Sequence, residues 1–213
     1  MTTAEDDGGG DDTIFFLLSA PTHHRFCSTL YTQIKLKKQK DNNWPWAISL
    51  VIDETDSPIQ EPSPFSKDWY SHKYNGPGVR YEVATSIQTG MVCWINGPFR
   101  PGVWPDDAIY KSGLYNHLPE GKLVHADCGY FNTTEEMFYI TPNTVAPKRL
   151  LKANHKARAR HEIVNSVYKK FNCLDHVFRH GVHKHGKVFC AVTSMVYLIM
   201  LVETQPYVVP YTE

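Results

Sequence analysis

The amino-acid sequence predicts one α/β domain, in which helices pack against a mixed sheet. Short apolar segments rich in β-branched residues alternate with segments of helical length, in the order strand, hairpin, helix, strand, helices. The chain has 213 residues, enough for one such domain with a substantial core, and its 42% hydrophobic and 13% aromatic content is typical of a globular protein.

The N-terminal residues do not share this pattern. Residues 1–13 hold five acidic side chains, no basic one and a run of three glycines, so we expect residues 1–20 to be a disordered acidic N-terminus. Residues 21–45 are read as a poorly defined leader, because no periodicity persists there. The folded domain is predicted over residues 46–205.

The first half of this domain predicts a strand followed by a hairpin. Residues 47–52 (AISLVI) form an apolar run that we expect to be a buried strand ending at Asp53. Residues 56–78 are rich in proline and are predicted to be a long loop. Residues 79–89 alternate as a strand does, and a turn leads into a partner strand at 91–95.

The second half predicts a helix, a strand and two longer helices. Asp106 or Asp107 is expected to cap a helix that runs to Leu118. A strand at 122–126 then leads into Asp127. The two longer helices are predicted near 154–172 and 187–203, and the second is apolar nearly all round, so we expect it to be buried.

Charge and cysteine usage indicate an intracellular protein. Net charge is zero, yet residues 148–187 hold eleven Lys and Arg side chains against two acids. Five scattered cysteines suit a reducing compartment. The acidic start is a poor secretory signal, and the apolar run at 195–202 is too short to span a bilayer, so no membrane partner is expected.

Three acidic residues stand where a divalent-metal site would need them. Asp53 and Asp127 each follow a predicted strand, and parallel strands bring their carboxyl ends together. Glu162 is the one acid in a helix otherwise filled with Lys and Arg. Such carboxylates can bind Mg²⁺, and two ions about 4 Å apart can activate a water for phosphodiester cleavage. We expect DNA phosphates to be bound by the surrounding basic residues, namely Lys156, Arg158, Arg160, Lys169, Lys170 and Arg179.

Each acid also has an ordinary structural interpretation. Asp53 or Asp127 alone could form a turn at the end of a strand. Glu162 could be the helical partner of Arg158, one turn before it.

Several short motifs resemble the DDE endonuclease domain of Harbinger-type (PIF/Harbinger) transposases. The resemblance covers Trp46 to Glu203, and thirty-four residues separate the second acid, Asp127, from Glu162, a spacing typical of DDE enzymes. The matching stretches are Asp53-Glu54-Thr55 with the following Pro58 and Ile59, Pro101-Gly102 with Asp106, Asp127-Cys128-Gly129-Tyr130, Arg158 to Glu162, and the basic-aromatic Tyr168-Lys169-Lys170-Phe171 and Phe178-Arg179.

The resemblance implies an RNase H-like fold with Asp53 on the first strand, Asp127 after the fourth strand and Glu162 on a later helix. It implies a nuclear enzyme that needs Mg²⁺ or Mn²⁺, held by these three carboxylates. Such an enzyme cuts DNA at element ends and joins the 3′-OH to a target, with a separate DNA-binding protein as a further candidate partner. Asp106 matches a family position but is not one of the three metal ligands.

The chain departs from the family pattern at three places. The family's glycine after the first aspartate is Glu54 here, which we expect to add charge beside the metal site and to stiffen a turn. The apolar residue before the glutamate is His161. The helical DNA-binding region expected upstream has no counterpart in the weakly patterned residues before Trp46.

Three other functions compete with the endonuclease. Histidines at 176, 180, 183 and 185, with His155 and His161 upstream, could bind Zn²⁺, although no cysteine pair completes a zinc-finger pattern. Cys128 could be a nucleophile near His125, but His125 shares a strand face with Asp127 and not with Cys128. The strongest competitor is a catalytically inactive, transposase-derived remnant that binds DNA or protein.

Overall fold

The computed structural model describes residues 48–203, except for residues 65, 88, 119–121, 128–129, 131–138 and 141–147. The predicted acidic N-terminus and leader lie outside the described residues. The strands are β1 (Ile48–Pro58), β2 (Tyr70–Ser71), β3 (Gly76–Ser86), β4 (Val92–Phe99), β5 (Leu123–His125) and β6 (Tyr139–Ile140). The helices are α2 (Asp106–Ser112), α3 (Lys148–Tyr168), α4 (Asn172–Asp175) and α5 (Val182–Val202), with short 3₁₀ helices at Lys67–Trp69 and Leu114–His117.

The strands form one mixed sheet in the order β2-β3-β1-β5-β6, and β4 pairs with β3. Strand β1 is antiparallel to β3 and parallel to β5, and β5 is parallel to β6. Strands β3 and β4 form the antiparallel hairpin expected from the sequence. The predicted α/β fold, a mixed sheet flanked by helices, is therefore confirmed, and this strand arrangement is consistent with an RNase H-like fold.

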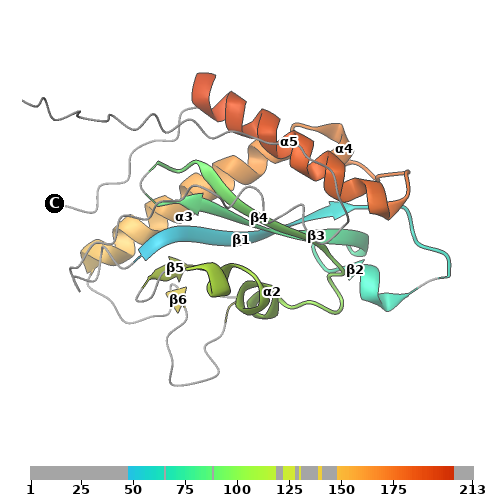
Figure 1. Ribbon diagram of the computed structural model, residues 1–213, viewed down its shortest axis with the longest axis horizontal. Coiled ribbons are helices and arrows are strands. Elements are labelled where there is room, and N and C mark those ends of the chain that lie inside the picture. Colours follow the sequence, from blue (N-terminus) through green and yellow to red (C-terminus); the bar gives the residue numbers. More distant parts are fainter. Residues whose placement is uncertain are drawn as a thin grey trace, which may run out of the picture.

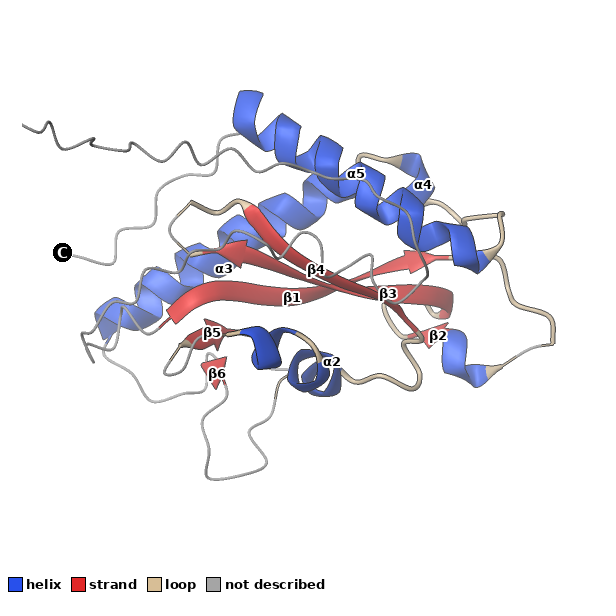
Figure 2. Cartoon of the chain, viewed as in Figure 1, coloured by secondary structure: helices blue, strands red, loops and turns tan. Residues whose placement is uncertain are grey.

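Helices cover both faces of the sheet (Figure 1). Helices α3, α4 and α5 lie on one face, where Tyr81 of β3 stacks on Phe189 of α5 with ring centroids 3.7 Å apart. Helix α2 lies against the other face, where Tyr110 and Leu114 pack on Ile52. Figure 2 shows the resulting three layers, with the strands between the two sets of helices. Each face thus buries its own apolar cluster.

The strands differ from the prediction mainly at their ends. Strand β1 does not end at Asp53 but continues to Pro58, because β3 pairs with it along its whole second half. The predicted loop over 56–78 is wrong for the same reason: it contains the end of β1, the 3₁₀ helix at 67–69, strand β2 and the start of β3. Because β2 is an additional short strand, Asp127 follows the fifth strand rather than the fourth.

The helices also begin at other residues than predicted. Pro105 is the N-cap of α2 and makes no side-chain cap bond, so neither Asp106 nor Asp107 caps that helix; both lie in its first turn. Helix α3 begins at Lys148 and α5 at Val182, each earlier than expected.

Helix α5 is not buried all round. Phe189, Val192 and Val196 pack in the core, whereas the outer side exposes Met195 (51%) and Leu198 (58%). With 21 residues it is, within the described part of the chain, the one helix long and apolar enough by length and composition to cross a membrane. The apolar segment is therefore longer than the run at 195–202, on which the expectation of a segment too short to span a bilayer was based. Its packed inner face is that of a core helix.

Candidate functional site

The two faces of β1 carry two different groups of acidic side chains. Successive side chains of a strand point to opposite faces, so Asp53 and Glu54 point apart. Asp53 faces α3, where Asn165 donates a hydrogen bond from Nδ2 to its Oδ2 over 3.1 Å. Glu54 faces the α2 side, where the Tyr130 hydroxyl donates to it. Strand β1 therefore separates an accessible acidic site from a buried one.

Strand register places Asp127 near Asp53. Val51 of β1 is paired in parallel with His125 of β5, and each aspartate lies two residues beyond that pair. Both aspartates are half-buried. The expectation that parallel strands bring these two acids to one end of the sheet agrees with this register, although Asp53 lies within β1 and not at its end.

Helix α3 brings Glu162 near enough to Asp53 for its charge to act on that carboxyl. Burial raises the pKa of Asp53 to about 6, and the negative charges of Glu162 and Asp127 add to this increase. The Lys73 ammonium and the backbone N–H of Glu54 act in the opposite direction. The three acids predicted from sequence are thus close enough for the charges of two to act on the third.

A cationic side chain missed in the sequence borders this site. Lys73 lies in the turn between β2 and β3, is exposed, and donates from Nζ to the carbonyl oxygen of Glu54. The turn is held by a bond from the Tyr70 hydroxyl to Asn75 Oδ1, with Asn75 at a positive φ of 53°, and by a bond of 3.1 Å from the Tyr74 hydroxyl to the Asp56 carbonyl. This places a positive charge directly over β1 at Asp53.

The sequence suggested that Glu54 adds charge beside the predicted metal site and stiffens a turn, and the structure agrees with neither expectation. Glu54 lies within β1 and not in a turn. It is 2% exposed on the opposite face of β1, and burial raises its pKa well above its usual range. Its partner in register is Glu82 of β3, which accepts a bond of 2.7 Å from Trp94 Nε1. Burial raises the pKa of Glu82 to about 8, so Glu82 holds its proton at neutral pH.

Asp106 belongs to a structural ion-pair network. Arg80 Nη1 lies 2.6 Å from its Oδ1, and Arg80 Nε lies 2.8 Å from Asp56 Oδ1. Asp56 also accepts from Ser71 Oγ at 2.5 Å. The network ties β1, β2 and β3 to α2.

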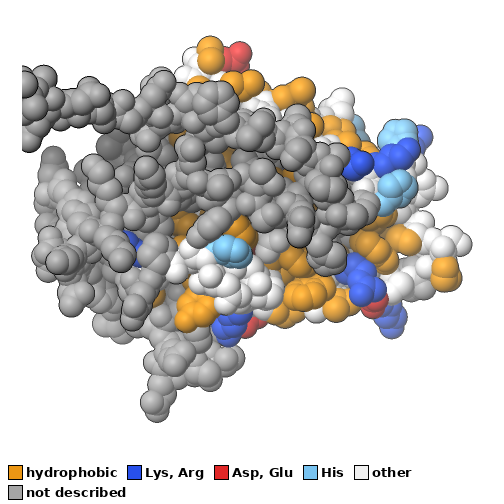
Figure 3. All heavy atoms as spheres, in the orientation of Figure 1, with side chains coloured by type: hydrophobic (Ala, Val, Ile, Leu, Met, Phe, Trp, Pro, Cys, Tyr) orange, Lys and Arg blue, Asp and Glu red, His pale blue; other side chains and the backbone are white. Residues whose placement is uncertain are grey.

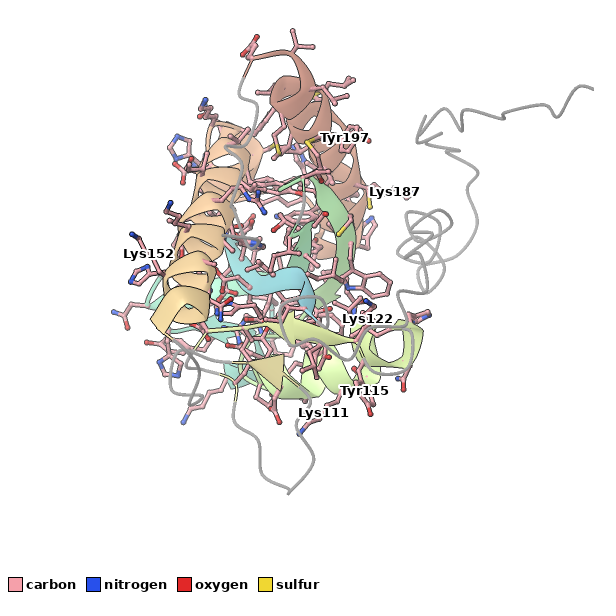
Figure 4. The ribbon with its side chains drawn as sticks, turned by 90° about the vertical axis from the view of Figure 1, so that its left-hand side faces the viewer. Lys111, Tyr115, Lys122, Lys152, Lys187 and Tyr197 are labelled. Carbon is pink, nitrogen blue, oxygen red and sulfur yellow. The ribbon has the colours of Figure 1, made fainter. Side chains whose placement is uncertain are left out.

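The predicted phosphate-binding residues differ in their exposure to solvent. Lys156, Lys170 and Arg179 are exposed, and Arg158 is half-buried. The outer side of α3 is open, as the projecting Lys152 shows (Figure 4).

Two of these predictions need correction. Arg160 is 1% exposed and donates to the carbonyls of Ser86 (3.1 Å) and Ile87 (2.7 Å), so the prediction that it binds phosphate is wrong. Lys169 is half-buried, and its ammonium donates to the Asp56 carbonyl at 2.5 Å and to the Tyr74 hydroxyl, so it is already engaged within the protein.

The histidines do not support a zinc site. His185 is buried and its Nδ1 lies 2.8 Å from the Tyr81 hydroxyl, while His176, His180 and His183 are exposed. His161 is buried beside Thr85 Oγ1 at 3.0 Å, and burial lowers its pKa to about 3, so it is neutral. Cys128, the candidate nucleophile, lies outside the described residues.

The donor chemistry at Asp53 fits a divalent cation. Carboxylate and amide oxygens are ligands that Mg²⁺ and Mn²⁺ accept. Asn165 Oδ1 is buried and, in the described part of the structure, has no hydrogen-bond partner. Burial raises the pKa of Asp53 and the charges of Glu162 and Asp127 add to this increase, so a bound cation would stabilise the ionised carboxylates. Among the described residues no three His, Cys, Asp or Glu side chains are already grouped to hold a metal ion, so binding would have to draw the three carboxylates together.

Sequence reasoning could have found Asn165 but not Lys73. Asn165 lies three residues after Glu162, on the same face of the helix. Lys73 belongs to a segment whose proline content predicted a loop, and nothing in the sequence indicates that this turn folds back over β1.

Comparisons with known proteins do not assign the chain to a family. No protein-family model matches the chain, and neither a curated protein nor a solved structure matches it significantly. The likeness to Harbinger-type transposases accordingly remains a prediction from the motifs.

Proposed function

We propose that this chain is a divalent-metal-dependent DNA endonuclease of the transposase type, similar to the DDE domains of Harbinger-type elements. One observation carries the proposal. Asp53, Asp127 and Glu162 come from β1, the end of β5 and α3, and the charges of the last two act on the carboxyl of Asp53. Acids distant in sequence whose charges act on one another beside a mixed sheet are candidates for a functional site.

The three carboxylates would hold Mg²⁺ or Mn²⁺, which when bound activates a water or a 3′-OH and stabilises the leaving oxygen. Asn165 fixes the orientation of Asp53 through its bond to Oδ2. Neutral His161, buried next to Glu162, holds that part of α3 against Thr85 of β3. These contacts would hold the carboxylates in position during the reaction.

DNA would lie over the exposed side of α3. Lys156 of α3, Lys170 just after it and Arg179 between α4 and α5 are exposed and would contact phosphates, an interaction that weakens steeply with salt. Lys73 would contact the phosphate at the site, because its ammonium lies at β1 beside Asp53. Recognition of particular DNA ends would fall to a separate DNA-binding protein, and such an enzyme would act in the nucleus.

Nicking of supercoiled plasmid by the purified chain, in Mg²⁺ or Mn²⁺, tests the proposal. Asp127→Asn should abolish metal-dependent nicking while leaving thermal unfolding unchanged. Asp107→Asn is the matched control, because Asp107 is an acid of α2 on the other face of the sheet, paired with Lys111 at 3.2 Å. Equal nicking by the wild type and Asp127→Asn would refute the assignment.

The second candidate is an inactive remnant that keeps the fold and binds DNA or protein. It is favoured by the lack, among the described residues, of a ready-made group of metal ligands. Salt-sensitive DNA binding without nicking, in the wild type and in both variants, would support this candidate instead.

A further inference from the structure

An exposed apolar stripe runs along the outer side of α5. Figure 1 shows α5 as the outermost helix on its side of the sheet. Met195, Leu198 and Val202 are 51%, 58% and 81% exposed, although a core helix would be expected to show polar side chains there. The outer face of the second half of α5 is therefore apolar, where a polar face would be expected.

The stripe has the spacing of a helix-pairing seam. Val188, which is half-buried and packs partly on the core, is followed by the exposed Ala191, Met195, Leu198 and Val202 at intervals of three, four, three and four residues. Apolar residues at alternating intervals of three and four residues line up along one side of a helix and mesh with the same pattern on another helix. Residues 188–202 contain no Asp, Glu, Lys or Arg, so the seam has no charge to desolvate.

The charges at the two ends of α5 decide what covers this stripe. His183, Lys184 and Lys187 are exposed in the first two turns, and Glu203 is exposed just after the last turn. In Figure 3, Lys, Arg and His side chains gather near the start of α5, whereas apolar side chains and an acidic one lie at its far end. Lys187 projects from the side of α5 that faces away from α3 (Figure 4).

We propose that α5 pairs in antiparallel orientation with α5 of a second copy of this chain, about a two-fold axis at Met195. In this register Val188 lies opposite Val202 of the other copy, and Lys187 lies level with its Glu203. The cationic first turns of each helix then meet the negative end of the partner's helix dipole. A parallel pair would bring the lysines of both copies together. The interface is isologous, as most homodimer interfaces are.

The size of the seam sets the expected strength of the dimer. A seam of five residues buries less than the roughly 1,200 Å² at the low end of stable specific interfaces. We therefore expect a dissociation constant of about 10 μM or weaker, so that the protein is a monomer when dilute and a dimer when concentrated.

Sedimentation equilibrium of the full chain from about 1 to about 200 μM brackets such a dissociation constant. The wild type should pass from one to two chains over this range, and Leu198→Glu should remain monomeric. Val177→Glu is the matched control, because Val177 is 52% exposed but lies outside α5, and it should dimerise as the wild type does. Thermal unfolding confirms that both variants fold.

A charge exchange tests the orientation. Lys187→Glu and Glu203→Lys should each weaken the dimer several-fold, and the double variant should restore it. Dimerisation that survives Leu198→Glu would overturn the proposal. So would a wild type that stays monomeric and instead binds phosphatidylcholine vesicles through α5, because the apolar stripe would then face lipid.

Discussion

Replacing Glu82 by glutamine should remove a specific pH dependence of stability. Glu82 is fully buried between the sheet and α2, and Trp94 Nε1 donates to its Oε1. Its Oε2 has no hydrogen-bond partner in the described part of the structure. Glutamine has the same shape and can still accept from Trp94, but it cannot ionise. The variant therefore isolates the cost of ionising this carboxyl.

The magnitude follows from the pKa of Glu82, which burial raises from 4.5 to about 8. Below pH 4.5 both the folded and the unfolded states hold the proton. Between pH 4.5 and 8 only the folded state holds it, so the free energy of unfolding falls by about 1.4 kcal/mol per pH unit. The loss amounts to about 3 kcal/mol at pH 7 and approaches about 5 kcal/mol above pH 8.

Urea unfolding of the wild type and Glu82→Gln at pH 5, 6.5 and 8 measures this difference. The two proteins should be nearly equal at pH 5, and the variant should be more stable by a margin that widens toward pH 8. Glu54 remains in both proteins, so its own titration contributes to both curves. Parallel stability curves from pH 5 to 8 would refute the claim that Glu82 is buried in its protonated form.

Two further predictions concern cationic side chains. Lys73→Gln should raise Mn²⁺ affinity about threefold, because a positive charge near Asp53 is removed, and should lower the rate of nicking about tenfold. If Lys73 had a purely structural role, the substitution would lower both quantities. Lys73→Arg should restore nicking. Arg160→Met should lower the free energy of unfolding by about 1–3 kcal/mol, because it removes the guanidinium donor of the Ile87 carbonyl, whereas the Ser86 carbonyl still accepts from the Gly90 N–H. DNA affinity of the folded Arg160→Met protein should be unchanged in a low-salt binding titration.

The sequence predicted the fold well where the hydrophobic pattern is local. The first apolar run, the hairpin and the two long helices all exist, and their order gives the mixed sheet. The pattern could not predict where β1 ends, because its second half is stabilised by pairing with β3, a partner distant in sequence. The outer side of α5 was misjudged because an all-apolar composition is typical of a buried helix.

The three acids of the proposed site could be chosen from the sequence, but the side chains around them could not. Asp53 and Asp127 follow from strand position, and Glu162 from its isolation among basic residues. The role of Arg160 depends on two carbonyls of the β3–β4 turn, which no helical pattern reveals. Glu54 was placed on the wrong face because β1 was expected to end one residue before it.

The most direct test of the account is a calorimetric titration of Mn²⁺ into the purified chain, beside Asp127→Asn and Asp107→Asn. A site formed by Asp53, Asp127 and Glu162 predicts that the wild type and Asp107→Asn bind Mn²⁺ alike. Asp127→Asn, which lacks one ligand charge, should bind at least about tenfold more weakly. Equal binding by all three proteins, or no binding by any, would contradict the three-carboxylate site.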